Sequence, residues 1–187
     1  MTARSTGSPS GSPSGRPGPA SSRTTPPPGA TVPEPSGPDR RDLDLKLADY
    51  DGCFGCGDQS SDGLRVKQTG ITGTEVTGEF TVLEAHQGAP GLAHGGVLAT
   101  AMDESLGSSA WVLGKRYVTG RLETDFMAPV PVGSTVYLRS WCTGVDGRKA
   151  YLQGEGRIGG PDGPIAVRAA ALFIEVPEEH FSREREG

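Results

Sequence analysis

The chain has 187 residues and a formal net charge of −5 at pH 7, because 18 lysines and arginines stand against 23 aspartates and glutamates. This length suits one domain with an appendage, and the mild acidity argues against nucleic-acid binding, which usually needs a basic face. The sequence shows no secretory signal, no run of the ~20 apolar residues that a membrane helix needs, and too few cysteines for a disulfide framework. We therefore expect a soluble cytoplasmic protein with no membrane or nucleic-acid partner.

Residues 1–38 differ in composition from the rest of the chain. Proline, glycine, serine and threonine make up most of them, and large aliphatic side chains are nearly absent. Such a segment cannot bury enough apolar surface to offset the entropy cost of ordering, so we expect a disordered tail. Residues 39–62 form a lead-in to the domain. The leucines spaced by two near its start fit a short strand or a helical turn equally well.

A cysteine pair lies in this lead-in, within the sequence Cys53-Phe54-Gly55-Cys56-Gly57. A structural zinc site normally takes four nitrogen or sulfur ligands, and the sequence has no second cysteine pair to supply them. A redox role would require a thioredoxin-like βαβ context, which the surrounding pattern does not show. We therefore expect a glycine-punctuated turn that packs onto the domain and binds no metal.

Strand-like and helix-like patterns begin at Gly63. Two strands are expected first, a short one at residues 64–67 and a half-buried one at residues 75–82, where apolar and polar residues alternate. A helix is expected from about Gly95 to Val112, ending before Gly114. Its apolar stripe contains many small residues, so another element should approach it closely, most simply a curved sheet.

Four more strands are expected after the helix, separated by proline-rich or glycine-rich turns, at residues 117–127, 135–142, 150–158 and 165–176. Strict alternation in the first of them places Val118, Leu122 and Phe126 on one face and Thr119, Arg121, Glu123 and Asp125 on the other. Antiparallel hairpins with a single helix to wrap predict an α+β domain over residues 63–176. A charged tail follows at residues 177–187.

Several motifs in this order resemble those of hotdog-fold acyl-CoA thioesterases, in particular the PaaI-like group and the human thioesterase-superfamily members. The motifs are Cys53-Phe54-Gly55-Cys56-Gly57, Gly63-Leu64-Arg65, His94-Gly95-Gly96, Asp103, Thr119 and Phe126-Met127-Ala128-Pro129. The resemblance covers residues 50–176. His-Gly-Gly alone is a weak motif, but its combination with an aspartate nine residues after the histidine and with the downstream strand is fairly specific.

The resemblance implies a hotdog fold, an antiparallel sheet around one long helix, and a role for several residues. Asp103 would be the nucleophile or the general base, and the N–H of Gly95, with that of Gly96, would polarise the thioester carbonyl. Thr119 would hold the attacking water. Glu104 adjoins Asp103, and some hotdog thioesterases use a glutamate, so the identity of the acid stays open. We expect His94 to orient the glycine backbone through a hydrogen bond.

The spacing of these residues bears on the oligomeric state. Gly95 and Asp103 are eight residues apart, which a helical rise of about 1.5 Å per residue converts to roughly 12 Å. One thioester carbon cannot contact both residues of the same helix. Two chains related by a two-fold axis, with antiparallel helices, would bring Asp103 of one chain to Gly95 of the other. The sequence therefore predicts a homodimer with composite sites, and the resemblance allows a dimer of dimers.

Coenzyme A carries phosphates, which an acidic protein must meet with a local basic patch. The candidates are Lys115 and Arg116 after the helix and Arg148 and Lys149 at a hairpin tip. No cofactor is implied. Two other functions remain possible at this point, a non-catalytic acyl-CoA-binding module and a hotdog dehydratase. The dehydratase fits less well, because that chemistry generally uses a histidine base paired with an acid.

Overall fold

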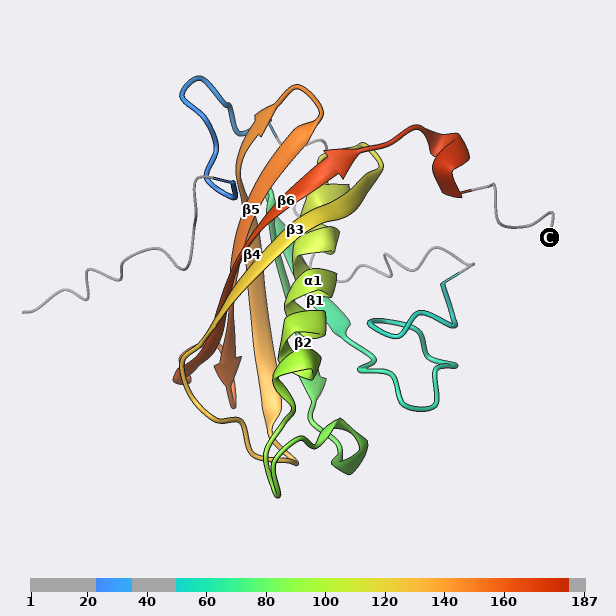
Figure 1. Ribbon diagram of the computed structural model, residues 1–187, viewed down its shortest axis with the longest axis vertical. Helices are drawn as coiled ribbons and strands as arrows, with labels where there is room; N and C mark the ends of the chain where they lie inside the picture. Colours follow the sequence, from blue (N-terminus) through green and yellow to red (C-terminus); the bar gives the residue numbers. More distant parts are fainter. Residues whose placement is uncertain (1–22, 35–49, 182–187) are drawn as a thin grey trace, which may run out of the picture.

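The computed structural model describes residues 23–34 and 50–181. Its main feature is one antiparallel sheet of six strands that curves around a single long helix (Figure 1). The elements are β1 (Lys67–Thr72), β2 (Glu75–Thr81), the short 3₁₀ helix η1 (Glu84–His86), α1 (Gly95–Trp111), β3 (Tyr117–Phe126), β4 (Thr135–Asp146), β5 (Lys149–Ile158), β6 (Ile165–Glu175) and the 3₁₀ helix η2 (Glu178–Phe181). This arrangement confirms the expected α+β class and hotdog architecture.

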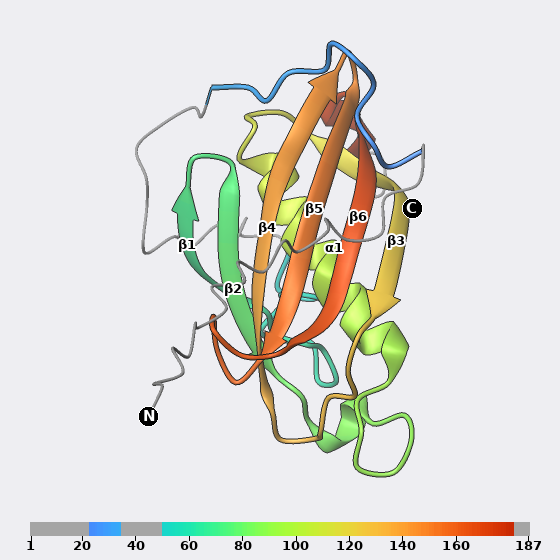
Figure 2. The same cartoon turned by 90° about the vertical axis from the view of Figure 1, so that its left-hand side faces the viewer.

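The strand order across the sheet is β1-β2-β4-β5-β6-β3, so β1 and β3 are its two edges (Figure 2). Consecutive hairpins join β1 to β2, β4 to β5 and β5 to β6. The strand β3 follows the helix in sequence, and within residues 23–34 and 50–181 it pairs with β6 alone. Edge strands have backbone N–H and C=O groups without a neighbour on one side, which makes them potential pairing surfaces.

The first strand lies further along the chain than the sequence predicted. The prediction of a strand at residues 64–67 is wrong, because residues 64–66 bond to the loop that contains Cys53 and Cys56 (the cysteine loop) instead of pairing with β2. The N–H of Leu64 donates to the carbonyl of Phe54, and the N–H of Val66 donates to that of Gly55. Arg65, between them, has a φ of 52°, which is incompatible with an extended strand. Regular pairing with β2 begins at Lys67.

The helix and the sheet approach each other closely because both present small residues at their contact. Ser105 and Ser109 of α1 hydrogen-bond through their hydroxyls to Ser140 of β4, at 2.9 and 2.6 Å, and all three are buried. A Cβ added at Gly154 of β5 would lie 2.9 Å from Cε of Met102 in α1. The small residues of the helix therefore allow the close contact that the sequence predicted.

Part of the N-terminal region lies on the face of the sheet away from α1 (Figures 1 and 2). Thr31 bridges to Val145 of β4, and the fully buried Thr24 donates a 2.8 Å hydrogen bond to Glu123 of β3. The described part of the expected disordered tail, residues 23–34, thus packs on the domain. Residues 1–22 and 35–49 lie outside the described residues. None of the described helices is long and apolar enough to cross a membrane.

Candidate active site

Asp103 and Thr119 form the centre of the candidate site. Asp103 lies half-buried in the middle of α1, and the hydroxyl of Thr119 in β3 donates a 2.8 Å hydrogen bond to its Oδ1. Both residues were predicted as catalytic from the sequence, and the structure brings them together. A carboxylate oriented by one hydroxyl on the sheet side of the helix can take a proton from water or attack an electrophilic carbon.

A β-bulge in β3 is responsible for this contact. The register of β3 against β6 shifts between Thr119 and Arg121, so one residue of β3 is left over. The strict alternation predicted for this strand is therefore wrong. Thr119 points to the helix, and Leu122, beyond the bulge, packs against the core on the same face. Glu123 lies on the outer face, where it accepts the hydrogen bond from Thr24.

Burial raises the pKa of both neighbouring carboxyl groups of α1. It raises the pKa of Asp103, and the hydrogen bond from Thr119 partly opposes that rise. Burial also raises the pKa of Glu104, and the negative charge of Asp103 adds to the rise, whereas hydrogen bonds from Cys56 and Cys53 oppose it. A carboxyl group with a raised pKa is a stronger base once ionised, which suits general-base chemistry near neutral pH.

His94 and the two glycines form the start of the helix. The Nδ1 atom of His94 accepts a 2.9 Å hydrogen bond from the N–H of Gly96, so the imidazole caps the helix as the sequence predicted. The N–H of Gly96 is therefore engaged, which weakens its case as a second donor to a substrate. Gly95 is the first helical residue, and its N–H has no partner within the helix.

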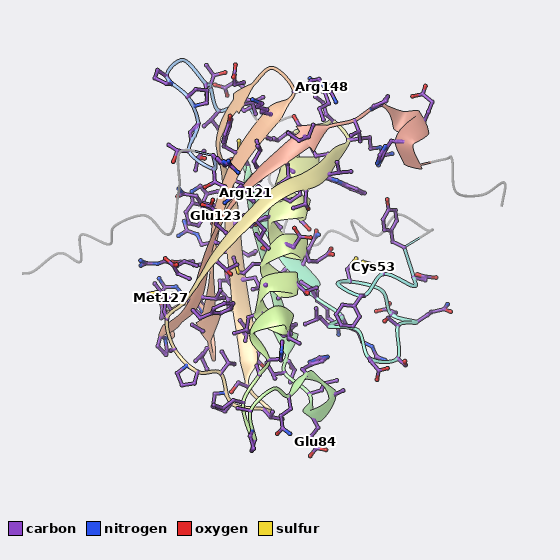
Figure 3. All side chains as sticks on the ribbon, viewed as in Figure 1. Cys53, Glu84, Arg121, Glu123, Met127 and Arg148 are labelled. Carbon is purple, nitrogen blue, oxygen red and sulfur yellow. The ribbon has the colours of Figure 1, made fainter. Side chains whose placement is uncertain are left out.

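An aromatic ring lies beside this helix start. A Cβ added at Gly95 would lie 3.4 Å from Cζ of Phe126, at the end of β3. Phe126 and the next residue, Met127, keep about half of their surface exposed, at 54% and 55%. The ring of Phe126 thus borders the helix start, and Met127 follows it at the end of β3, where Figure 3 labels it.

The four candidate phosphate-binding residues come together at the other end of the helix. Lys115 forms a 2.7 Å ion pair with Glu175, the last residue of β6, and Arg148 donates two hydrogen bonds to the main-chain oxygen of Glu175. Lys149 is exposed next to Arg148. Arg116 stacks on the ring of Trp111, 5.4 Å from its centroid. The two basic pairs, distant in sequence, therefore share one surface.

Two cysteines lie beside Glu104 of α1, a contact that the sequence did not predict. Cys53 lies in the loop beside α1 (Figure 3), and its Sγ is 3.8 Å from Oε2 of Glu104. Cys56 lies in the same loop, with its Sγ within 4.8 Å of both groups. Burial and the neighbouring charge of Glu104 raise the pKa of the Cys56 thiol. Sequence reasoning recognised the cysteine pair but had no signal for its contact with the helix, since 51 residues separate Cys53 from Glu104.

Comparison with known proteins shows which family part of this chain resembles. Residues 90–164, which include α1, β3, β4 and β5, match the family model of the thioesterase superfamily. The acyl-coenzyme A thioesterase THEM4 of Xenopus laevis is 33% identical over 90 residues, which are 48% of this chain and 40% of that protein. The chain therefore spans well under half of the length of this curated relative.

Solved structures agree with the same fold. The thioesterase superfamily protein RHA08564 is 31% identical, with a TM-score of 0.60 over 65% of this chain and 62% of that one. The PaaI protein of the E. coli phenylacetic acid degradation operon is 15% identical, with a TM-score of 0.57 over 64% of this chain and 86% of that one, and it supports the fold alone. Residues 90–164 are thus similar to the thioesterase superfamily, and the described domain shares the hotdog fold of these solved structures.

Proposed function

We propose that this protein hydrolyses an acyl-CoA thioester to the free acid and coenzyme A. The observation that carries the proposal is the hydrogen bond from Thr119 of β3 to Asp103 of α1, within the residues 90–164 that match the thioesterase superfamily. The relatives named acyl-coenzyme A thioesterase support the choice of substrate class. The cytoplasmic location expected from the sequence remains a prediction.

The active site would be assembled from two chains. Gly95 and Asp103 are separated by about 12 Å along one helix, so the carbonyl donor and the base of one reaction must come from different copies. The edge strand β3 offers the pairing surface, since among the described residues only β6 pairs with it, on one side. Pairing of two β3 edges about a two-fold axis would continue the sheet, align the helices antiparallel and cover Phe126 and Met127.

In this dimer Asp103 would act on the substrate carbonyl while Thr119 holds its carboxylate in position. Either Asp103 takes a proton from an attacking water or it attacks the carbonyl carbon itself, and both routes release the CoA thiolate. The N–H of Gly95 of the partner subunit would receive the developing oxyanion, helped by the positive end of the helix dipole. One such donor typically contributes about 3 kcal/mol at the transition state.

The phosphates of coenzyme A would bind at the basic surface formed by Lys115, Arg116, Arg148 and Lys149. These side chains lie near the C-terminal end of α1 and the end of β6, away from the helix start. A substrate that reaches from this surface to Asp103 would run along the helix. The apolar residues Phe126 and Met127 would then face the acyl group from the helix start of the partner subunit.

The test is thiol release from a panel of acyl-CoA esters by the purified full chain and by two matched variants. Asp103→Asn should lower kcat by about 10²–10⁴-fold, the usual contribution of a general base, while the dimer stays intact. Asp162→Asn, in an exposed turn, is the control and should retain full activity. Full activity in Asp103→Asn would refute the assignment, and an intact dimer without turnover on any ester would instead favour an acyl-CoA-binding module.

A further inference from the structure

The cysteine loop places three metal-ligating side chains around one point on α1. Sγ of Cys53, Sγ of Cys56 and a carboxylate oxygen of Glu104 all lie within 4.8 Å of one another. It is the only group of three such side chains found within the described ranges 23–34 and 50–181. All three residues are half-buried.

The loop backbone holds the two thiols in this arrangement. The N–H of Cys53 donates to the carbonyl of Tyr50, and the N–H of Gly57 donates to that of Cys53, which closes a tight turn around the cysteine pair. The bonds from Leu64 and Val66 back to Phe54 and Gly55, described above, fasten the same turn to the start of the domain. The thiols are therefore presented by a bonded turn and not by a free loop.

Two glycines let this turn pack closely against the helix and against its own backbone. A Cβ at Gly55 would overlap the carboxylate of Glu104, and a Cβ at Gly57 would overlap the backbone of Asp51 and Cys53. The buried glycine between the cysteines thus lets the turn sit directly on Glu104. This close approach brings both sulfur atoms to the carboxylate.

We propose that Cys53, Cys56 and Glu104 bind one divalent cation of the zinc class, with water as the fourth ligand. Zinc takes sulfur ligands at about 2.3 Å and oxygen ligands at about 2.0–2.2 Å, so a tetrahedral site separates sulfur from oxygen by roughly 3.5 Å. The 3.8 Å between Cys53 and Glu104 is close to that separation. Thiolates select soft cations over magnesium or calcium.

The proposal changes the interpretation of the cysteine pair and of Glu104. The sequence lacked the four nitrogen or sulfur ligands of a structural site, but a carboxylate 48 residues beyond Cys56 supplies the third protein ligand, and sites with three protein ligands keep a water. Glu104 would then be committed to the metal, which leaves Asp103 as the acid that faces Thr119. The cation would also tie the lead-in loop to α1 next to Asp103.

Cobalt(II) titration of the full chain, purified under reducing conditions and freed of metal by chelation, tests the site directly. We expect one Co(II) per chain and a thiolate-to-cobalt charge-transfer band in the near ultraviolet, which added Zn(II) abolishes by displacing the cobalt. Cys56→Ser should weaken Co(II) binding by at least about tenfold and diminish the band. Cys142→Ser alters a buried cysteine of β4 and should change neither.

The rival arrangement is a hydrogen-bonded cluster in which the Cys53 thiol simply donates to Glu104. A wild-type chain that gives no charge-transfer band with Co(II) would establish that arrangement and overturn the proposal. A band that persists in Cys56→Ser and in Cys53→Ser would overturn it as well. Because the wild-type spectrum alone decides the first point, the test holds even if a cysteine variant fails to fold.

Discussion

The hydroxyl of Thr119 donates a 2.8 Å hydrogen bond to Oδ1 of Asp103, across the contact between the edge strand β3 and the helix α1. The bond exists because the bulge after Thr119 turns this side chain toward the helix. It opposes the effect of burial on the pKa of Asp103. The same hydrogen bond therefore holds the carboxylate in position and favours its ionised form.

Removal of this hydroxyl should shift the pH dependence of hydrolysis. In Thr119→Val the pKa of Asp103 is expected to rise further, because the bond from Thr119 lowers it in the wild type. A smaller fraction of Asp103 is then ionised at a given pH, so the acid limb of the kcat/KM profile moves to higher pH. At a pH on this acid limb we expect a loss of up to about tenfold, since a hydrogen bond to a charged group contributes about 1.5 kcal/mol.

The matched control for this profile is Thr81→Val, which changes an exposed threonine of β2. It should leave both the rate and the acid limb unchanged. An acid limb that stays at the wild-type pH in Thr119→Val would show that Asp103 is not the group whose ionisation governs the reaction.

Mixing two inactive variants should restore activity if the site is shared between chains. Gly95→Pro removes the N–H proposed to bind the oxyanion, at a first helical position where proline is generally tolerated, and should cost about 10²–10³-fold in kcat. Asp103→Asn removes the base. In a heterodimer of the two, one composite site is intact, so a fully exchanged mixture should recover about a quarter of the wild-type rate.

The oligomeric state and the hydrolysis rate should be measured on the same samples. Mass determination in solution checks that both variants remain dimers, and subunit exchange is confirmed with differently tagged chains. If exchanged dimers show no more activity than the separate variants, the two residues do not act across the interface.

Binding of coenzyme A should depend on the basic surface. In the double variant Lys115→Gln with Lys149→Gln, the KM for an acyl-CoA is expected to rise several-fold at low ionic strength, because two charges that attract the phosphates are lost. The KM for the corresponding acyl-pantetheine, which lacks those phosphates, should not change. Lys67→Gln, in the opposite edge strand β1, is the control, and an equal rise for both substrates would argue against a phosphate site here.

The serine cluster between helix and sheet should matter for stability and not for chemistry. Ser140 donates a 2.7 Å hydrogen bond to the carbonyl of Ser105 and is bonded to the hydroxyls of Ser105 and Ser109. Ser140→Ala leaves these buried groups without their partner, at a cost of about 1–3 kcal/mol in the free energy of unfolding. Denaturant unfolding measures this loss, with the exposed Ser61→Ala as control. An unchanged midpoint would mean that the cluster does not stabilise the fold.

Local patterns in the chain were sufficient to predict most elements of the fold. Alternation of apolar and polar residues indicated β2 and the four strands after the helix, because one face of each strand packs on α1 and the other faces outward. The helix, its histidine cap and the glycine after its end were predicted within a few residues. The separation of Gly95 and Asp103 along a helix depends only on the helical rise, so the expectation of a shared site also came from sequence alone.

Tertiary structure decided what depends on contacts between distant segments. The bulge that turns Thr119 toward Asp103 arises from the pairing of β3 with β6, about fifty residues later, and alternation within β3 predicted the opposite face. Leu64 and Val66 carry a strand-like pattern but bond to the cysteine loop. The approach of Cys53 and Cys56 to Glu104 likewise depends on where that loop packs, which the local pattern does not encode. Side-chain spacing determines the elements, whereas packing determines which side chains meet.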